Sequence, residues 1–222
     1  MDLFYPRLCM ACGRSLLEHE RVICSYCIVQ LPKTHFHNKI DNPIETTFWG
    51  RADIKAATAY YKYTKEGKVQ HLIHQLKYKG FREVGVYVGK ELGKLLNENA
   101  RFSDIDYIIP VPLHKSKLQK RGFNQSELFA RGLEKSMKAM VIDDNLYRKV
   151  ASSTQTKKSR WERYKNVNDI FGIRDASLFE NKKLLLVDDV ITTGSTIEGC
   201  ASILNQVEGV DVSVAAMASA AF

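Results

Sequence analysis

The sequence predicts an α/β protein in which a parallel sheet is flanked by helices and preceded by a small N-terminal metal-binding module. Three observations carry this fold class. Residues 183–187 read as a strand whose last four residues are an uninterrupted apolar run, which is typical of a strand buried on both faces. Residues 195–207 and 210–217 then have the patterns of a helix and a second strand, the order of a parallel crossover unit. Four cysteines near the N-terminus come in two closely spaced pairs.

The remaining elements alternate in the same way. Apolar and aromatic residues predict a strand over 54–63, and apolar residues at helical spacing predict helices over 67–78 and 82–97. A buried strand is predicted over 107–111, and a basic loop over 114–122 connects it to a helix over 125–137. A further strand is predicted over 146–150. The stretch 35–50 contains asparagine, proline and glycine with little periodicity, so we expect a linker. The predicted domains are a module over 1–36 and an α/β domain over 50–222.

Charge and hydropathy limit the classes of function. The 222 residues carry 33 Lys and Arg against 25 Asp and Glu, a formal net charge of +8 that favours anionic partners. No apolar run approaches the ~20 residues that a membrane span needs. The first ten residues lack the basic and apolar regions of a secretory signal. We therefore expect a cytoplasmic protein without a membrane span.

The paired cysteines predict a metal site. Cys9 and Cys12, and then Cys24 and Cys27, are each separated by two residues, with eleven residues between the pairs. Two such pairs can complete a tetrahedron of thiolates around Zn²⁺, with no open position for a substrate, so the expected role is structural. About thirty residues bury too little apolar area to fold alone, and metal binding would supply the missing free energy. An iron–sulfur cluster or redox-active cysteines remain the alternatives.

A second motif follows the apolar strand at 183–187. Asp188 and Asp189 come next, and residues 192–196 then read Thr-Thr-Gly-Ser-Thr before a helix. Carboxylates at the carboxyl edge of a parallel sheet suit the vicinal hydroxyls of a sugar. Small residues at a helix N-terminus suit a phosphate, because free N–H groups and the helix dipole converge there. The plainer interpretation is a capped helix after an acidic turn.

This segment resembles the motif that binds 5-phosphoribosyl 1-diphosphate (PRPP) in type I phosphoribosyltransferases. The resemblance implies a type I phosphoribosyltransferase-like fold, with Asp188 and Asp189 as the catalytic residues that hold the ribose hydroxyls. It also implies that the 5-phosphate is held by Thr192, Thr193, Gly194, Ser195 and Thr196. PRPP normally arrives with Mg²⁺, so magnesium is the expected second cofactor.

Further segments narrow the resemblance. Residues 76–80 (Leu-Lys-Tyr-Lys-Gly), 110–114 (Pro-Val-Pro-Leu-His) and 121–125 (Arg-Gly-Phe-Asn-Gln) resemble the ComF family, as do Gln155 and Thr156 followed by Arg163. This family is tied to natural competence and DNA uptake. The resemblance implies a PRPP-binding protein that acts in competence and can transfer phosphoribose to an unknown acceptor. The alternative is a non-catalytic module that binds single-stranded DNA or a competence helicase.

Two basic segments are further candidates. In the resembled fold, the loop after the strand at 107–111 binds the diphosphate of PRPP, which implies roles for Lys115 and Arg121. A solvated, basic helix start is the alternative for this loop. The polar stretch after Thr156 resembles a mobile lid, and its mixture of cations and an aromatic ring would equally suit single-stranded nucleic acid or an exposed amphipathic helix. The lid or nucleic-acid candidates are Lys157, Lys158, Arg160, Trp161 and Arg163.

Overall fold

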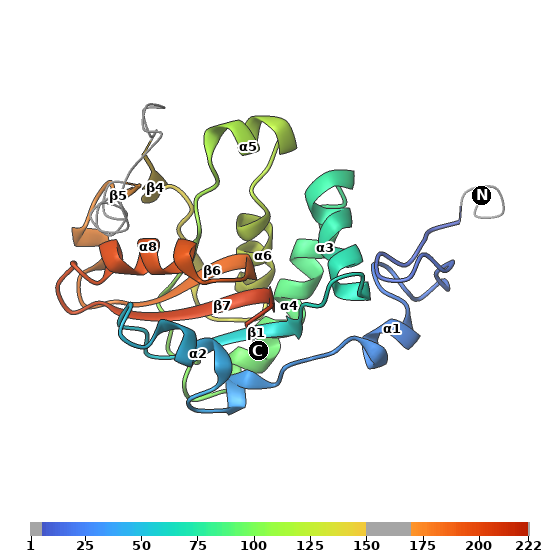
Figure 1. The fold of residues 1–222 in the computed structure, drawn as a ribbon, viewed down its shortest axis with the longest axis horizontal. Coiled ribbons are helices and arrows are strands. Elements are labelled where there is room, and N and C mark those ends of the chain that lie inside the picture. Colours follow the sequence, from blue (N-terminus) through green and yellow to red (C-terminus); the bar gives the residue numbers. More distant parts are fainter. Residues whose placement is uncertain (1–5, 150–169, 222) are drawn as a thin grey trace.

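The computed structural model describes residues 6–149 and 170–221. Its centre is a parallel sheet with the strand order β1-β7-β6-β2-β3 (Figure 1). These strands are β1 (Ala57–Lys62), β2 (Tyr107–Pro110), β3 (Met140–Val141), β6 (Lys183–Ile191) and β7 (Asp211–Ser219). The fold class expected from the sequence, a parallel sheet flanked by helices, is confirmed.

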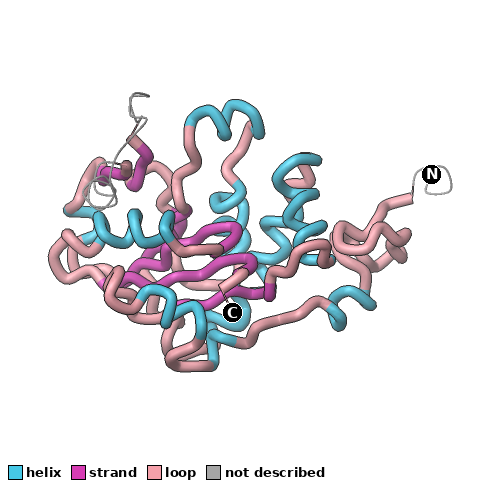
Figure 2. The backbone as a smooth tube through the Cα atoms, viewed as in Figure 1, coloured by secondary structure: helices cyan, strands magenta, loops and turns pink. Residues whose placement is uncertain are grey.

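Helices cover both faces of the sheet (Figure 2). On one face lie α3 (Lys68–Lys79), α4 (Glu83–Asn97) and α6 (Gln125–Glu134), and on the other lie α2 (Pro43–Phe48) and α8 (Ser195–Leu204). Strand β6 serves both layers because successive side chains of a strand alternate between faces. Leu185 and Val187 join the cluster with α4 and α6, whereas Leu184 and Leu186 join the cluster with α8.

The packing of α4 against α6 depends on glycine. A Cβ atom at Gly89 would lie 2.2 Å from the carbonyl oxygen of Phe129, and one at Gly132 would lie 2.4 Å from the carbonyl oxygen of Val86. Any larger residue at these positions would push the two backbones apart. This close approach holds the N-terminus of α6 near the carboxyl end of β6, where the acidic pair lies.

The crossover from β6 through α8 to β7 is present as expected, but β6 is longer than the sequence predicted. The acidic pair was expected in a turn after residue 187. Instead, β6 continues to Ile191, with Asp188 opposite Ala216 and Ile191 opposite Ser219 of β7. The pairing persists because β7 also runs two residues beyond its expected end. Both aspartates are therefore held in a regular strand rather than in a turn.

The expected linker over 35–50 is wrong. Asn42 caps α2 through its side-chain oxygen, which accepts from the backbone N–H of Ile44 and Glu45, and its amide donates to the carbonyl oxygen of Ala57 at 2.9 Å. Ile44 and Phe48 are buried against the sheet. Asparagine followed by proline marks a helix start as well as a loop, and here the apolar residues that follow decide for the helix.

The cysteine-rich segment packs directly on the sheet domain. It includes α1 (Ser25–Gln30), and its Ile23, Cys27 and Leu31 belong to the same apolar cluster as α3 and α4. Just after it, the backbone pairs with the free edge of β1, with the N–H of Thr34 donating to the carbonyl oxygen of Tyr60 at 3.0 Å. The division into domains 1–36 and 50–222 stays a prediction, since one apolar cluster runs through both parts.

The remaining elements lie at the periphery. The basic stretch expected as a loop contains a short helix, α5 (Lys115–Arg121), which has no buried residue. Strands β4 (Leu146–Arg148) and β5 (Phe171–Ile173) form an antiparallel ribbon, and the 3₁₀ turns η1 (Phe36–Asn38) and η2 (Ser177–Phe179) complete the fold. Among the described residues, every helix is too short or too polar to cross a bilayer.

Candidate functional site

The two aspartates of β6 lie at the carboxyl end of the strand and leave it on opposite sides. Asp188 accepts a hydrogen bond from the Ser126 hydroxyl at 2.9 Å and one from the backbone N–H of Asp189 at 2.8 Å. Asp189 accepts one from the Lys77 ammonium at 2.8 Å. The N-terminus of α6 and the C-terminal turn of α3 therefore meet at the acidic pair.

The environment of Asp188 disfavours its charge. Burial and the neighbouring Asp189 carboxylate raise the pKa of Asp188 to about 7, although the Asp189 N–H, the Ser126 hydroxyl and the Lys77 ammonium oppose that rise. A carboxyl group that titrates near neutrality can accept or donate a hydrogen bond under physiological conditions. This is a property of functional carboxyl groups more often than of structural ones.

The loop after β6 surrounds a small cavity. Asp188 lines it together with residues 190–197, which include the whole Thr-Thr-Gly-Ser-Thr segment. Gly194 is the N-cap of α8 and has φ +75°, a left-handed conformation that glycine adopts without strain. The Thr193 and Ser195 hydroxyls lie 3.0 Å apart across the loop. The loop thus presents hydroxyl groups and the N-terminal end of α8 to one concave space.

Arg51 contacts this loop and α8, and it was not among the residues predicted from the sequence. Its guanidinium donates to the carbonyl oxygens of Thr193 at 2.9 Å and Thr47 at 3.0 Å, and its Nε donates to the Glu198 carboxylate of α8 at 3.1 Å. The contact is not expected from the sequence, because the predicted linker over 35–50 includes Thr47 and ends directly before Arg51. A buried helix after an Asn-Pro cap was the signal that could have revealed it.

The basic segment contributes to a second cavity, of about 440 Å³, between α3 and α5. Figure 1 shows these two helices projecting on the same side of the sheet. Arg121, one of the two cations expected here, lines the cavity, and its guanidinium lies 5.4 Å from the centre of the Tyr78 ring. Lys115, the other, is exposed at the first turn of α5 and is not among the lining residues. The cavity also has cations contributed by Lys77, Lys117 and Lys120.

A third cavity, of about 490 Å³, connects the other two. Lys77 and Tyr78 line both this cavity and the basic cavity. Val190 and Thr192 line both this cavity and the small cavity after β6. Its other lining residues are Tyr63, Gln70, Ile73 and His74. The three neighbouring cavities, together called the cleft below, therefore follow one another from the N-terminus of α8 and Asp188 to the basic face of α5. The lid candidates Lys157, Lys158, Arg160, Trp161 and Arg163 lie outside the described residues.

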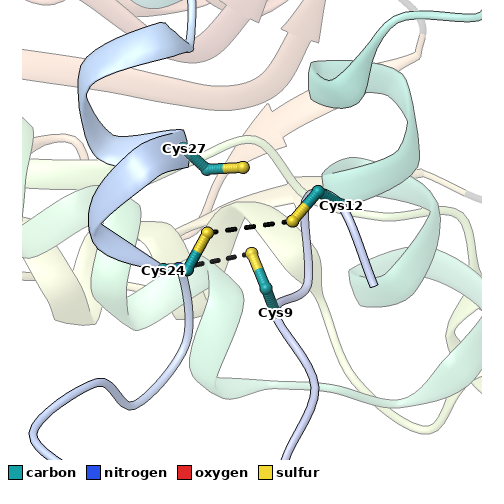
Figure 3. Close-up of side chains that lie close together, drawn as sticks. All are labelled: Cys9, Cys12, Cys24 and Cys27. Carbon is teal, nitrogen blue, oxygen red and sulfur yellow. Dashed lines mark hydrogen bonds between the residues drawn. The ribbon is translucent and has the colours of Figure 1, made fainter. Parts of the chain in front are cut away.

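The four N-terminal cysteines form a separate cluster (Figure 3). Their sulfur atoms all lie within 4.8 Å of one another, and the side chains point toward a common centre. The Cys12 and Cys24 sulfurs are 3.7 Å apart, close to the ~3.8 Å between two ligands of a tetrahedral zinc ion with ~2.3 Å zinc–sulfur bonds. The residues expected to bind metal, Cys9, Cys12, Cys24 and Cys27, are thus brought together as a set that fits Zn²⁺.

The electrostatics of the cluster also fit a cation. Burial raises the pKa of Cys24 and Cys27, so thiolates at these positions need a compensating positive charge. Burial also acts to raise the pKa of Cys9, but backbone N–H groups, first that of Cys24 and then those of Ala11 and Cys12, lower it to about 7. The Cys24 N–H donates to the Cys9 sulfur at 3.3 Å, a contact that stabilises a thiolate ligand.

Comparisons with known proteins agree with this architecture. Residues 118–221 match the family described as "Phosphoribosyl transferase domain". The chain is 28% identical over 201 residues to "DNA utilization protein YhgH" of Shigella flexneri, covering 89% of this chain and 83% of that protein. It is 31% identical over 114 residues to "Competence protein F" of Haemophilus influenzae, covering 51% of this chain and 50% of that protein.

Solved structures give a weaker likeness. Adenine phosphoribosyltransferase from Saccharomyces cerevisiae aligns with 13% sequence identity and a TM-score of 0.40, covering 65% of this chain and 71% of that one. The domain match and the two relatives, together with a four-cysteine cluster ahead of a parallel α/β sheet, agree with the resemblance of the chain to the ComF family of phosphoribosyltransferase-like proteins.

Proposed function

We propose that the protein binds PRPP, accompanied by Mg²⁺, in the cleft at the carboxyl end of β6. The observation that carries this proposal is the order of chemical groups along the cleft. Hydroxyl groups, a helix N-terminus and the Asp188 carboxylate line the first cavity, Lys77 in the next cavity pairs with the Asp189 carboxylate, and the last cavity is lined by four cations. PRPP has a 5-phosphate, two ribose hydroxyls and a diphosphate in that same order.

Each part of PRPP has proposed partners. Residues Thr192, Thr193, Gly194, Ser195 and Thr196 hold the 5-phosphate. The carboxylates of Asp188 and Asp189 accept hydrogen bonds from the ribose hydroxyls. Arg121 holds the diphosphate with Lys117 and Lys120, since these three line the basic cavity and Lys115 does not. Mg²⁺ screens the charge of the diphosphate when it is bound.

The chemistry that this arrangement supports is phosphoribosyl transfer. The bond from C1 of the ribose to the diphosphate oxygen breaks, and its electron pair leaves with the diphosphate. A lone pair of the acceptor nucleophile forms the new bond to C1, and the acceptor's proton is released to solvent. Cations at the diphosphate stabilise the charge that develops there. The cavity lined by Tyr63, Gln70 and His74 is the proposed place of the acceptor.

The names of the relatives, which refer to DNA utilization and competence, support a role of the proposed activity in competence and DNA uptake, and we propose that it acts in the cytoplasm. A second candidate function, a non-catalytic module for single-stranded DNA or a competence helicase, is favoured by an exposed aromatic ring beside the basic cavity. Tyr78, which lines the basic cavity, remains 58% exposed next to cations that would contact phosphates. The lid candidates at 157–163 extend the proposed DNA-binding surface by resemblance. The cysteine cluster holds a structural Zn²⁺ in either case.

Calorimetry with PRPP and Mg²⁺ tests the binding proposal. We expect binding to the wild-type chain, no detectable binding to the Asp188→Asn, Asp189→Asn double variant, and unchanged binding to Asp53→Asn, in which an exposed carboxylate is neutralised. Equal PRPP affinity in the wild type and the double variant would contradict the proposal. Release of diphosphate from PRPP in the presence of nucleobases, amines or single-stranded DNA then tests for transfer.

An anisotropy titration with a labelled single-stranded oligonucleotide tests the second candidate. If about four phosphates are contacted, log–log affinity should fall with salt with a slope of about −3. Tyr78→Ala should weaken binding with little change in slope, because stacking is not ionic. No anisotropy change at low salt and micromolar protein would rule out direct DNA binding and leave the cations to the diphosphate.

A further inference from the structure

Lys77 lies between two parts of the cleft that carry opposite charge. Its ammonium group is 2.8 Å from Asp189 Oδ1, and the two side chains are only 20% and 12% exposed. The same side chain lines the basic cavity and the central cavity of the cleft. Within the described residues, Asp189 forms an ion pair with no other cation. Lys77 therefore neutralises the Asp189 carboxylate, which is proposed to accept a hydrogen bond from a ribose hydroxyl.

The backbone of Lys77 is firmly held. In the same helix, Leu72, Ile73 and Leu76 are buried in the core. The helix ends on Gly80 at φ +75°, whose N–H donates to the carbonyl oxygen of Gln75. Movement of α3 would break this packing, so a change in the position of the ammonium group has to come from rotation about the side-chain bonds. Lysine has a flexible four-carbon stem that allows such a rotation.

The basic cavity offers the ammonium group a second partner once an anion is present. None of the described residues that line this cavity is acidic. Among the described residues, Lys117, Lys120 and Arg121 form no ion pair with a carboxylate. A fourth cation would be repelled from an empty cavity, and Asp189 attracts it away. A diphosphate group in the cavity would reverse that preference, because its charge exceeds that of one carboxylate.

We propose that Lys77 is a ligand-responsive cation with two positions, paired with Asp189 in the empty cleft and turned toward the diphosphate group in the occupied one. When the Lys77 ammonium group turns away, the Asp189 carboxylate is free to accept a hydrogen bond from a hydroxyl group. The identity of that hydroxyl as ribose rests on the proposed function, but the movement itself needs only a diphosphate anion. Since coupling between two sites is reciprocal, a hydroxyl ligand at Asp189 also favours the diphosphate.

The experiment is a double-mutant cycle read by calorimetry with inorganic diphosphate, without magnesium, on the full-length protein as purified. Asp189→Asn releases Lys77 and should tighten diphosphate binding by about fivefold, at the lower end of typical coupling. Lys77→Gln should weaken binding by a similar factor. Introducing Asp189→Asn into the Lys77→Gln chain should then change the affinity less than twofold. Lys79→Gln, an exposed lysine of the same helix, is the matched control and should behave as the wild type.

The cycle separates a moving lysine from a simple change in charge. If Asp189→Asn tightens binding equally with and without Lys77, loss of a negative charge is sufficient and the inference is overturned. It is also overturned if Asp189→Asn leaves the affinity unchanged, or if neither the wild type nor that variant binds millimolar diphosphate. Should Lys77→Gln fail to fold, Lys77→Arg keeps a cation, and the gain from Asp189→Asn should persist in it; loss of the gain there overturns the inference.

A parallel titration with PRPP and Mg²⁺ distinguishes this inference from the proposed function. If the wild type binds PRPP while the diphosphate cycle shows no coupling, the inference fails and the proposed function stands. If the cycle shows the expected coupling but PRPP does not bind, the proposed function fails, and Lys77 responds to a different diphosphate ligand.

Discussion

Replacing Asp188 by Asn should stabilise the protein at alkaline pH. Asp188 Oδ1 accepts hydrogen bonds from the Ser126 hydroxyl and the Asp189 N–H, and the amide oxygen of Asn can accept both. The substitution therefore removes a charge from a partly buried position and keeps the local contacts. Its cost falls on ligand binding, since a carboxylate is a better acceptor than an amide for the hydroxyls of a sugar.

The sign and size follow from the pKa of Asp188, which burial and Asp189 raise from 3.8 to about 7. The folded chain binds this proton more tightly than the unfolded chain. Stability from Asp188 is therefore fully present below pH 3.8 and is lost as the pH rises to about 7. The upper bound is about 4 kcal/mol, at 1.36 kcal/mol for each pK unit. We expect a gain of about 2 kcal/mol at pH 8, since Asp189 shares in the coupled titration.

Urea unfolding at pH 5 and pH 8, each with the wild type as reference, measures this gain. The difference between Asp188→Asn and the wild type should be less than half as large at pH 5 as at pH 8, where it should be about 2 kcal/mol in favour of the variant. Using the difference removes the effect of pH on the cysteine cluster, which is common to both chains. Asp53→Asn, an exposed position, should show no such dependence. A variant that gains equally at both pH values would refute the buried-charge argument.

Two further predictions concern the metal cluster and the phosphate loop. Purified protein should contain one zinc per chain by mass spectrometry of the metal, and Cys12→Ser should lose most of it and melt at lower temperature; less than half an equivalent in the wild type, with no other metal, would contradict the site. Gly194→Ala should lower the free energy of unfolding by about 2 kcal/mol, because φ is +75° and the new Cβ would lie 2.9 Å from the Phe48 ring. Gly50→Ala has a similar φ of +69° with open space around it, so a loss there as large as that at Gly194 would show that the Phe48 contact contributes nothing.

The features that could be predicted from the sequence are those that depend on residues close together in the chain. Helices such as α4 need apolar residues at helical spacing, so α4 was predicted close to its observed bounds, whereas the apolar run at 184–187 predicted the first half of β6 but not its continuation to Ile191. The cysteine cluster was equally readable, because two residues between the members of each pair let both thiolates reach one ion. The acidic pair and the threonine-rich loop could also be recognised, because they follow one another closely in the chain and form one continuous motif.

Contacts between segments that are distant in the chain could not be predicted from the sequence. The Lys77–Asp189 pair joins residues 112 positions apart, and the Arg51 contact with Thr193 joins residues 142 positions apart. Asn42 and Pro43 are compatible with a loop or with a helix start, and the burial of Ile44 and Phe48 against the sheet decides for the helix. The choice between Lys115 and Arg121 likewise depends on which face of a short helix turns toward α3. The sequence by itself was sufficient for the central strands, the long helices, the cysteine cluster and the threonine-rich loop after β6, because neighbouring residues specify them. Only the tertiary structure decided which charges meet in the cleft, because that depends on how the helices pack on the sheet.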